Sequence, residues 1–220
     1  MKLMLLFETV ARLSAEERRE LGQYLEAPLT GTGKLARTML AEGTLLSEGR
    51  LSIPFLRAAV QSACTAGEVD WAADFLTQYA DHLVGQDRVP VRALHELMVA
   101  YHQKNYGKVL RGSALLRTGA PRFEILQRVL QIKAFYDQDR TEEALRAAET
   151  LRKLIRRKRD LGERFAQGYR EFTVWVERLG KRPPATATAR QDMAAAIRAS
   201  EAAEMLWLLD RCRGAGDPQS

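Results

Sequence analysis

The sequence is poor in the residues on which many metalloproteins and secreted proteins depend, with two cysteines and three histidines in 220 residues. Cys64 and Cys212 stand far apart with no paired spacing around either, so we expect neither a disulfide framework nor a zinc site. His95 and His102 lie seven positions apart, whereas metal-binding pairs on a helix are spaced by three or four. We therefore expect these two and His82 to be surface or partly buried side chains, and we expect no cofactor.

Long apolar runs and strand patterns are also scarce. The apolar run Leu3 to Phe7 ends at Glu8, so it is too short for a signal-peptide core or a membrane span, and we expect a cytoplasmic protein. Alternation with period two is not sustained anywhere, whereas apolar residues recur at steps of three and four throughout the chain after residue 50. The sequence therefore predicts an all-α fold.

Recognisable catalytic motifs are missing. The segment LTGTGKLART (29–38) resembles a phosphate-binding loop, but that motif needs a glycine where Pro28 stands and a Ser or Thr where Leu35 stands. The acidic pair Glu142 and Glu143 falls in a predicted first helical turn, where negative charge complements the helix dipole. No nucleophile elbow or cysteine-protease signature is present either. We expect a protein that is not an enzyme.

What the chain does contain is a loose internal repeat. Tight turns are predicted at 66–70, 104–107 and 137–140, and looser breaks at 85–90 and 118–121. The small residues that follow the tight turns, Ala72, Val109 and Ala144, are separated by 37 and 35 positions. A helix, turn and helix recurring with a period in the mid-thirties predicts a tetratricopeptide-like α-α superhelix, a solenoid of helical hairpins. An irregular helical bundle is the alternative.

The predicted organisation has five parts, which differ in composition and periodicity. They are an N-terminal helical hairpin and connector (1–50), tetratricopeptide-like repeats (51–180), a proline-rich linker (181–190), a C-terminal capping helix (191–213) and a disordered tail (214–220). The C-terminal helix carries an apolar run, Met205 to Leu209. Either it folds back to cap the end of its own solenoid, or it docks into a neighbouring molecule.

Four segments carry a resemblance to a known family. They are VARLSAEERRELGQYLEAPL (10–29), TAGEVDWAADFLTQYADHL (65–83), LRKLIRRKRDLGERFAQGYREFTVWVERL (151–179) and AIRASEAAEMLWLLDR (196–211). Together they resemble a family of uncharacterised bacterial tetratricopeptide-like helical-repeat proteins. Their motifs are hydrophobic patterns, so the resemblance implies an architecture and no activity. The segment PLTGTGKL departs from the family, which tends to carry aromatic and asparagine residues after that proline.

Positive charge is concentrated in the second half of the chain and is densest in LRKLIRRKRD (151–160), with six cations in ten positions. On a helix these cations point away from the predicted apolar face, which comprises Ala144, Ala148, Leu151 and Ile155. Glu142 precedes Arg146 by four positions, a spacing that favours an ion pair. Glu149 precedes Lys153 in the same way. The pattern favours a solvated helix terminus over a nucleic-acid-binding site.

Two kinds of side chain remain as candidates for binding a partner. The first kind is cationic and lies where the basic run has few acids of its own: Arg156, Arg157, Lys158 and Arg159. The second is aromatic, represented by Trp71 and Tyr101, since solenoids of this class bind peptides on grooves lined with aromatic residues. We expect a non-catalytic protein-protein interaction module or scaffold. The alternative is an RNA-associated protein that uses the basic second half.

Overall fold

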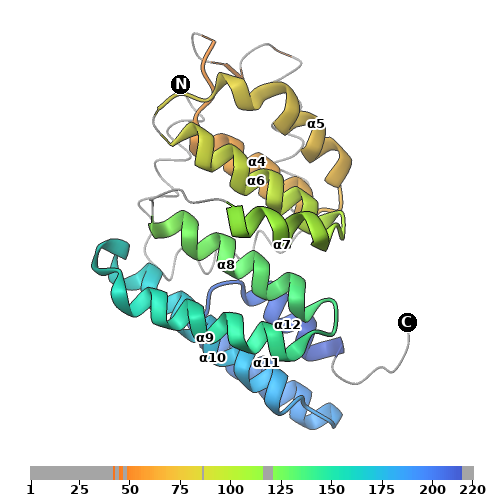
Figure 1. The fold of residues 1–220 in the computed structure, drawn as a ribbon. Helices are drawn as coiled ribbons and strands as arrows, with labels where there is room; N and C mark the ends of the chain where they lie inside the picture. Colours follow the sequence, from red (N-terminus) through yellow and green to blue (C-terminus); the bar gives the residue numbers. More distant parts are fainter. Residues whose placement is uncertain (1–41, 43–44, 47–48, 86, 116–120, 215–220) are drawn as a thin grey trace. The chain divides into compact units, whose positions relative to one another are not determined.

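The structure is a computed structural model that describes residues 42, 45–46, 49–85, 87–115 and 121–214. In these residues it contains nine α-helices, two short 3-10 helices and a single isolated bridge between Leu51 and Leu83 (Figure 1). The predicted all-α class is therefore confirmed. The chain divides into two compact units, residues 1–88 and 89–220. The predicted N-terminal hairpin and the segment 29–38 lie outside the described residues.

The described part of the first unit is a helical hairpin of α4 (Ile53–Thr65) and α5 (Val69–Tyr79), followed by η1 (Ala80–His82). Helix α4 begins where the Ser52 hydroxyl accepts a hydrogen bond from the backbone N–H of Phe55, at 3.3 Å. The predicted turn follows at Gly67, whose φ of 80° lies in the left-handed region that favours glycine. The core of the hairpin comprises Leu56, Ala59, Val60, Ala72, Phe75 and Leu76.

The second unit contains the other seven α-helices. They are α6 (Arg88–His102), α7 (Tyr106–Leu115), α8 (Pro121–Tyr136), α9 (Thr141–Arg157), α10 (Glu163–Lys181), α11 (Ala187–Ala199) and α12 (Met205–Gly214), with η2 (Arg159–Leu161) before α10. Helices next to each other in the chain pack together, α7 on α8, α8 on α9 and α9 on α10 (Figure 1). Helix α12 packs on both α10 and α11. One apolar core runs through these helices.

The predicted tight turns between α6 and α7 and between α8 and α9 are confirmed. Lys104 and Asp139 hold left-handed conformations in these turns, with φ of 57° and 59°. The small residues after the three tight turns, Ala72, Val109 and Ala144, are all fully buried. A helix, a tight turn and a second helix thus follow one another at α4–α5, α6–α7 and α8–α9.

The single C-terminal helix predicted for 191–213 is wrong, because the segment forms two helices. Helix α11 starts inside the predicted linker, where the Thr186 hydroxyl caps the backbone N–H of Ala189 at 3.1 Å. It ends at Ser200, and the chain turns back when the N–H of Ala203 donates to the carbonyl of Gly168 on α10, at 2.9 Å. Glycine is needed there, since a Cβ on Gly168 would lie 3.2 Å from the backbone oxygen of Glu201.

Helix α12 packs on its own chain. Of the two arrangements that the sequence left open, packing on the same chain or docking into a neighbouring molecule, the structure has the first. Trp207, Leu208 and Leu209 are buried, whereas Leu206 is 63% exposed. The Trp207 ring lies 5.4 Å from that of Tyr136 and 5.9 Å from that of Phe172, measured between centroids. The described helices include none that combines the length and apolar character needed to cross a membrane.

Candidate ligand-binding surface

Half of the six cations in the basic run (151–160) pair with acids of the same unit. The predicted apolar face is buried, and the two predicted ion pairs are present, Arg146–Glu142 and Lys153–Glu149, each at 2.8 Å. These pairs are exposed, so they contribute little stability. They reduce the positive electrostatic potential that the basic run presents to a ligand.

Two further cations of the run pair with acids from other helices, which sequence spacing does not reveal. Arg152 lies 2.7 Å from Glu177 on α10. Lys158 lies 3.3 Å from Glu124 on α8. Arg156 and Arg157 are exposed and form no ion pair with a described residue. The side chain of Arg159 is not among those described. The run therefore retains two free cations, Arg156 and Arg157, among its described side chains.

The two aromatic candidates occupy different environments. Trp71 on α5 is partly exposed, and its ring stacks on Phe75 with 5.0 Å between centroids. Tyr101 on α6 is only 8% exposed, and its hydroxyl donates a hydrogen bond of 2.5 Å to Asp137. Trp71 therefore retains surface for a ligand, whereas Tyr101 faces the interior of the second unit.

Tyr101 belongs to a largely buried polar cluster that joins α6, the end of α8 and the two ends of α12. The cluster comprises Tyr101, Lys133, Asp137, Glu204 and Arg211. Lys133 lies 2.8 Å from Glu204 and 4.7 Å from the centre of the Tyr101 ring, and Arg211 lies 3.3 Å from Asp137. Two cations thus face two carboxylates, so the cluster balances its own charge and holds α12 against the core.

Burial also sets the protonation of groups beside the cluster. It raises the pKa of Tyr101, with the negative charge of Asp137 adding to the effect, so this phenol stays protonated. Burial, aided by the positive charge of Lys133 and opposed by Glu204, lowers the pKa of His102 to about 4. His102 is therefore neutral at pH 7. These groups form a structural network whose polar atoms pair with one another.

The cysteines and histidines show no sign of redox or metal chemistry in the described part of the chain. Burial raises the pKa of Cys64 to about 12, so it remains a thiol at neutral pH. The ring of His95 is buried and lies 2.6 Å from the carbonyl of Val91, and that of His82 lies 3.0 Å from the carbonyl of Gly49. No three His, Cys, Asp or Glu side chains of the described residues lie together as a metal site would require.

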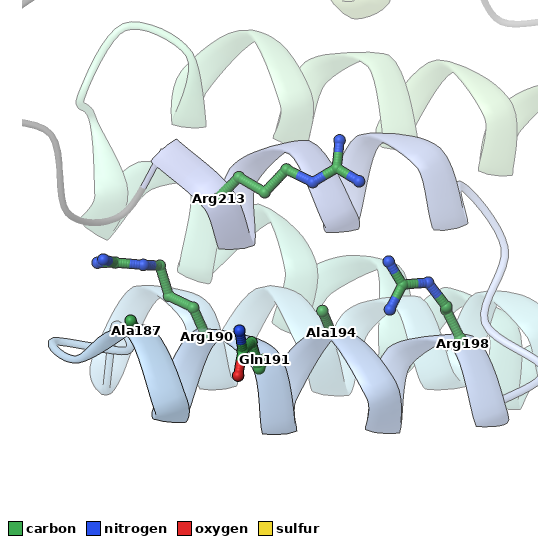
Figure 2. A pocket seen from close by; sticks show the side chains of 6 residues that line it. All are labelled: Ala187, Arg190, Gln191, Ala194, Arg198 and Arg213. Atoms are coloured by element: carbon green, nitrogen blue, oxygen red, sulfur yellow. The ribbon is translucent and has the colours of Figure 1, made fainter.

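A different charged surface lies between α11 and α12. Three arginines and three smaller or neutral residues line an open pocket of roughly 360 Å³, which we call the arginine pocket. Its residues are Ala187, Arg190, Gln191, Ala194 and Arg198 from α11 and Arg213 from α12 (Figure 2). Among the described residues, no acidic side chain lines it and no carboxylate forms an ion pair with any of the three arginines.

Sequence reasoning missed the arginine pocket because it placed 181–190 in a linker and 191–213 in one helix. A signal was present, since Ala187, Gln191, Ala194 and Arg198 follow one another at steps of four, three and four, which places them on one helix face. The position of Arg213 opposite that face depends on the turn at Ser200 to Glu204, which the sequence did not predict.

Comparisons of the chain with protein-family models, with curated proteins and with solved structures found no match. The family resemblance and the tetratricopeptide-like superhelix therefore stay predictions. What the chain binds must be inferred from the charge and shape of its own surface.

Proposed function

We propose that the chain is a non-catalytic, tetratricopeptide-like interaction module that binds another protein, and that it works in the cytoplasm. The observation that carries this proposal is the contrast between two groups of charges in the second unit. The charges of the polar cluster pair with one another, whereas Arg190, Arg198 and Arg213 have no acidic partner among the described residues. Charge left unpaired on a rigid helical surface is available to an external partner.

The recurring hairpins support the architectural part of the proposal. Three helix–turn–helix units follow in sequence, each with a buried small residue after its tight turn. Stacks of such hairpins bury one continuous core and leave the other helix faces free for partners. The resemblance to bacterial helical-repeat proteins agrees with this picture and adds no activity to it.

A nucleic-acid partner is the second candidate, and the distribution of charge favours it. Residues 89–220 contain 25 Lys and Arg against 16 Asp and Glu, whereas residues 1–88 contain 9 against 12. A basic unit of this kind attracts phosphates as well as carboxylates. Against it stands the pairing of Arg152, Lys153 and Lys158 with acids, which weakens the densest basic run.

The experiment that separates these functions is affinity capture from the source cell with the full chain as bait, with and without nuclease. We expect one protein to be recovered in equal yield from both samples and identified by mass spectrometry. Recovery that disappears after nuclease treatment, with RNA in the untreated eluate, would overturn the protein-binding proposal.

A further inference from the structure

The cations that line the arginine pocket are spread along α11 and α12. Arg190 and Arg198 are eight residues apart on α11, which corresponds to about 12 Å along the helix axis. In Figure 2 the Arg190 side chain extends toward the N-terminal end of α11, while Arg213 extends along α12 toward Arg198. A single phosphate or carboxylate cannot contact both ends of such a site. The spacing requires a ligand with several negative charges in a row.

The electrostatic effects of the three arginines meet at a common region, and no acid of the described residues pairs with them. Burial raises the pKa of the Cys212 thiol between α11 and α12, and the positive charges of Arg190, Arg198 and Arg213 all oppose that shift. Arg211, only two residues from Arg213, instead pairs with Asp137 and Asp210. Three unpaired guanidinium groups favour a ligand whose negative charges can reach all of them.

An extended peptide fits this length. Side chains on one side of an extended strand are about 7 Å apart, so three acidic residues at alternate positions span about 13 Å. Ala187 and Ala194 contribute only methyl groups to the lining, and the Gln191 amide can exchange hydrogen bonds with a peptide group. Guanidinium groups also match carboxylates in a planar, bidentate geometry.

A nucleic-acid strand fits less well, because its bases need surfaces on which to stack. Proteins that bind single strands interleave aromatic side chains with their cations. The six residues that line the arginine pocket include no aromatic side chain. The large apolar residues exposed in the described chain are aliphatic: Val84, Val89, Val174 and Leu206.

We propose that the arginine pocket binds an extended acidic segment of a partner protein, in which carboxylates at alternate positions pair with Arg190, Arg198 and Arg213. This inference rests on the protein-binding function proposed above and identifies where and by what chemistry the partner is held. Specificity comes from the spacing of the carboxylates, since clustered acids would reach only one end of the pocket.

The test measures binding of a fluorescein-labelled synthetic peptide of alternating glutamate and serine to the full chain by fluorescence anisotropy at physiological salt. We expect the Arg190→Glu/Arg198→Glu double variant to bind at least about tenfold more weakly. The matched control is Lys108→Glu/Arg111→Glu, which changes two exposed cations on α7 of the same unit and lowers the net charge equally. We expect the control to stay within about twofold of the wild-type affinity.

Three outcomes would overturn the proposal: no binding of the peptide to the wild-type chain, equal losses in the two double variants, or tighter binding of a single-stranded oligonucleotide of equal charge that depends on Arg190 and Arg198. Arg213→Glu provides a second variant should the double variant misfold, as judged by circular dichroism. If Arg190→Glu/Arg198→Glu still captures the cellular protein in full yield, the protein-binding function stands and this pocket is not its site.

Discussion

Lys133 illustrates how a single buried charge ties the C-terminal segment to the core. It is only 8% exposed, and its ammonium group lies 2.8 Å from a carboxylate oxygen of Glu204. These residues are 71 positions apart, so no local spacing predicts the pair. The ion pairs that were predicted, such as Glu142 with Arg146, lie within one helix, where a spacing of four brings side chains together.

Removing the partner of Lys133 tests this ion pair. We expect Glu204→Gln to reduce the free energy of unfolding by about 1–3 kcal/mol, because it leaves a buried ammonium without a carboxylate while Glu204 itself is partly exposed. Urea unfolding followed by circular dichroism measures the change. Glu201→Gln, an exposed acid three residues earlier, should change stability by less than about 0.5 kcal/mol. Equal stability of the Glu204 variant and the wild type would contradict the role of the pair.

His102 makes stability depend on pH. Its folded pKa of about 4 lies below the ordinary 6.5, so between these values the unfolded chain binds a proton that the folded chain does not. The contribution is fully present above about pH 6.5 and is lost as the pH falls toward 4. We expect the wild type to lose about 2 kcal/mol more over this interval than His102→Gln. Parallel urea titrations at pH 7 and pH 4.5 measure the difference, and equal losses would contradict it.

At the scale of elements, the sequence predicts which segments with a clear apolar period form helices. It predicts less well where these helices end and which helices pack together. Helix α9 combines an acidic first turn with a basic last turn and one apolar face, so its existence and its buried side follow from the sequence. The break between α11 and α12 depends on a hydrogen bond to the carbonyl of Gly168, a contact made only after α10 is in place. The arginine pocket was missed for the same reason.

Docking of α12 on its own chain predicts a sharp contrast between neighbouring residues. Trp207→Ala should reduce the free energy of unfolding by about 3–5 kcal/mol, because a large buried ring between Tyr136 and Phe172 is lost. Leu206→Ala, at an exposed position of the same helix, should cost less than about 0.5 kcal/mol. Urea unfolding and hydrogen exchange of the α12 amides measure both variants. Similar effects of the two substitutions would mean that α12 does not dock through Trp207.

The whole molecule consists of two compact units, a division that the sequence prediction of one repeat region over 51–180 did not include. A repeat period in the sequence indicates that hairpins recur, but it does not indicate how tightly each hairpin packs against the next. Each unit has its own small buried residue after a tight turn, Ala72 in the first and Ala144 in the second. We expect the units to unfold as separate cooperative transitions.

The three tryptophans can distinguish the unfolding of the two units, since Trp71 belongs to the first unit and Trp175 and Trp207 to the second. In protein labelled with 5-fluorotryptophan, ¹⁹F NMR through a urea titration should show the Trp175 and Trp207 signals changing together and the Trp71 signal changing at a different concentration. Ala144→Leu should destabilise only the second unit, by about 1–3 kcal/mol, because a larger side chain overpacks a fully buried site.

Ala72→Leu is the matched substitution for the first unit and should shift only the Trp71 transition, by a similar amount. Because each substitution enlarges a fully buried alanine in the same way, the pair separates local overpacking from a general loss of stability. If either substitution moves all three signals together, the chain unfolds as one cooperative body. The repeats would then be coupled across residue 88, and the stability of the arginine pocket would depend on both units.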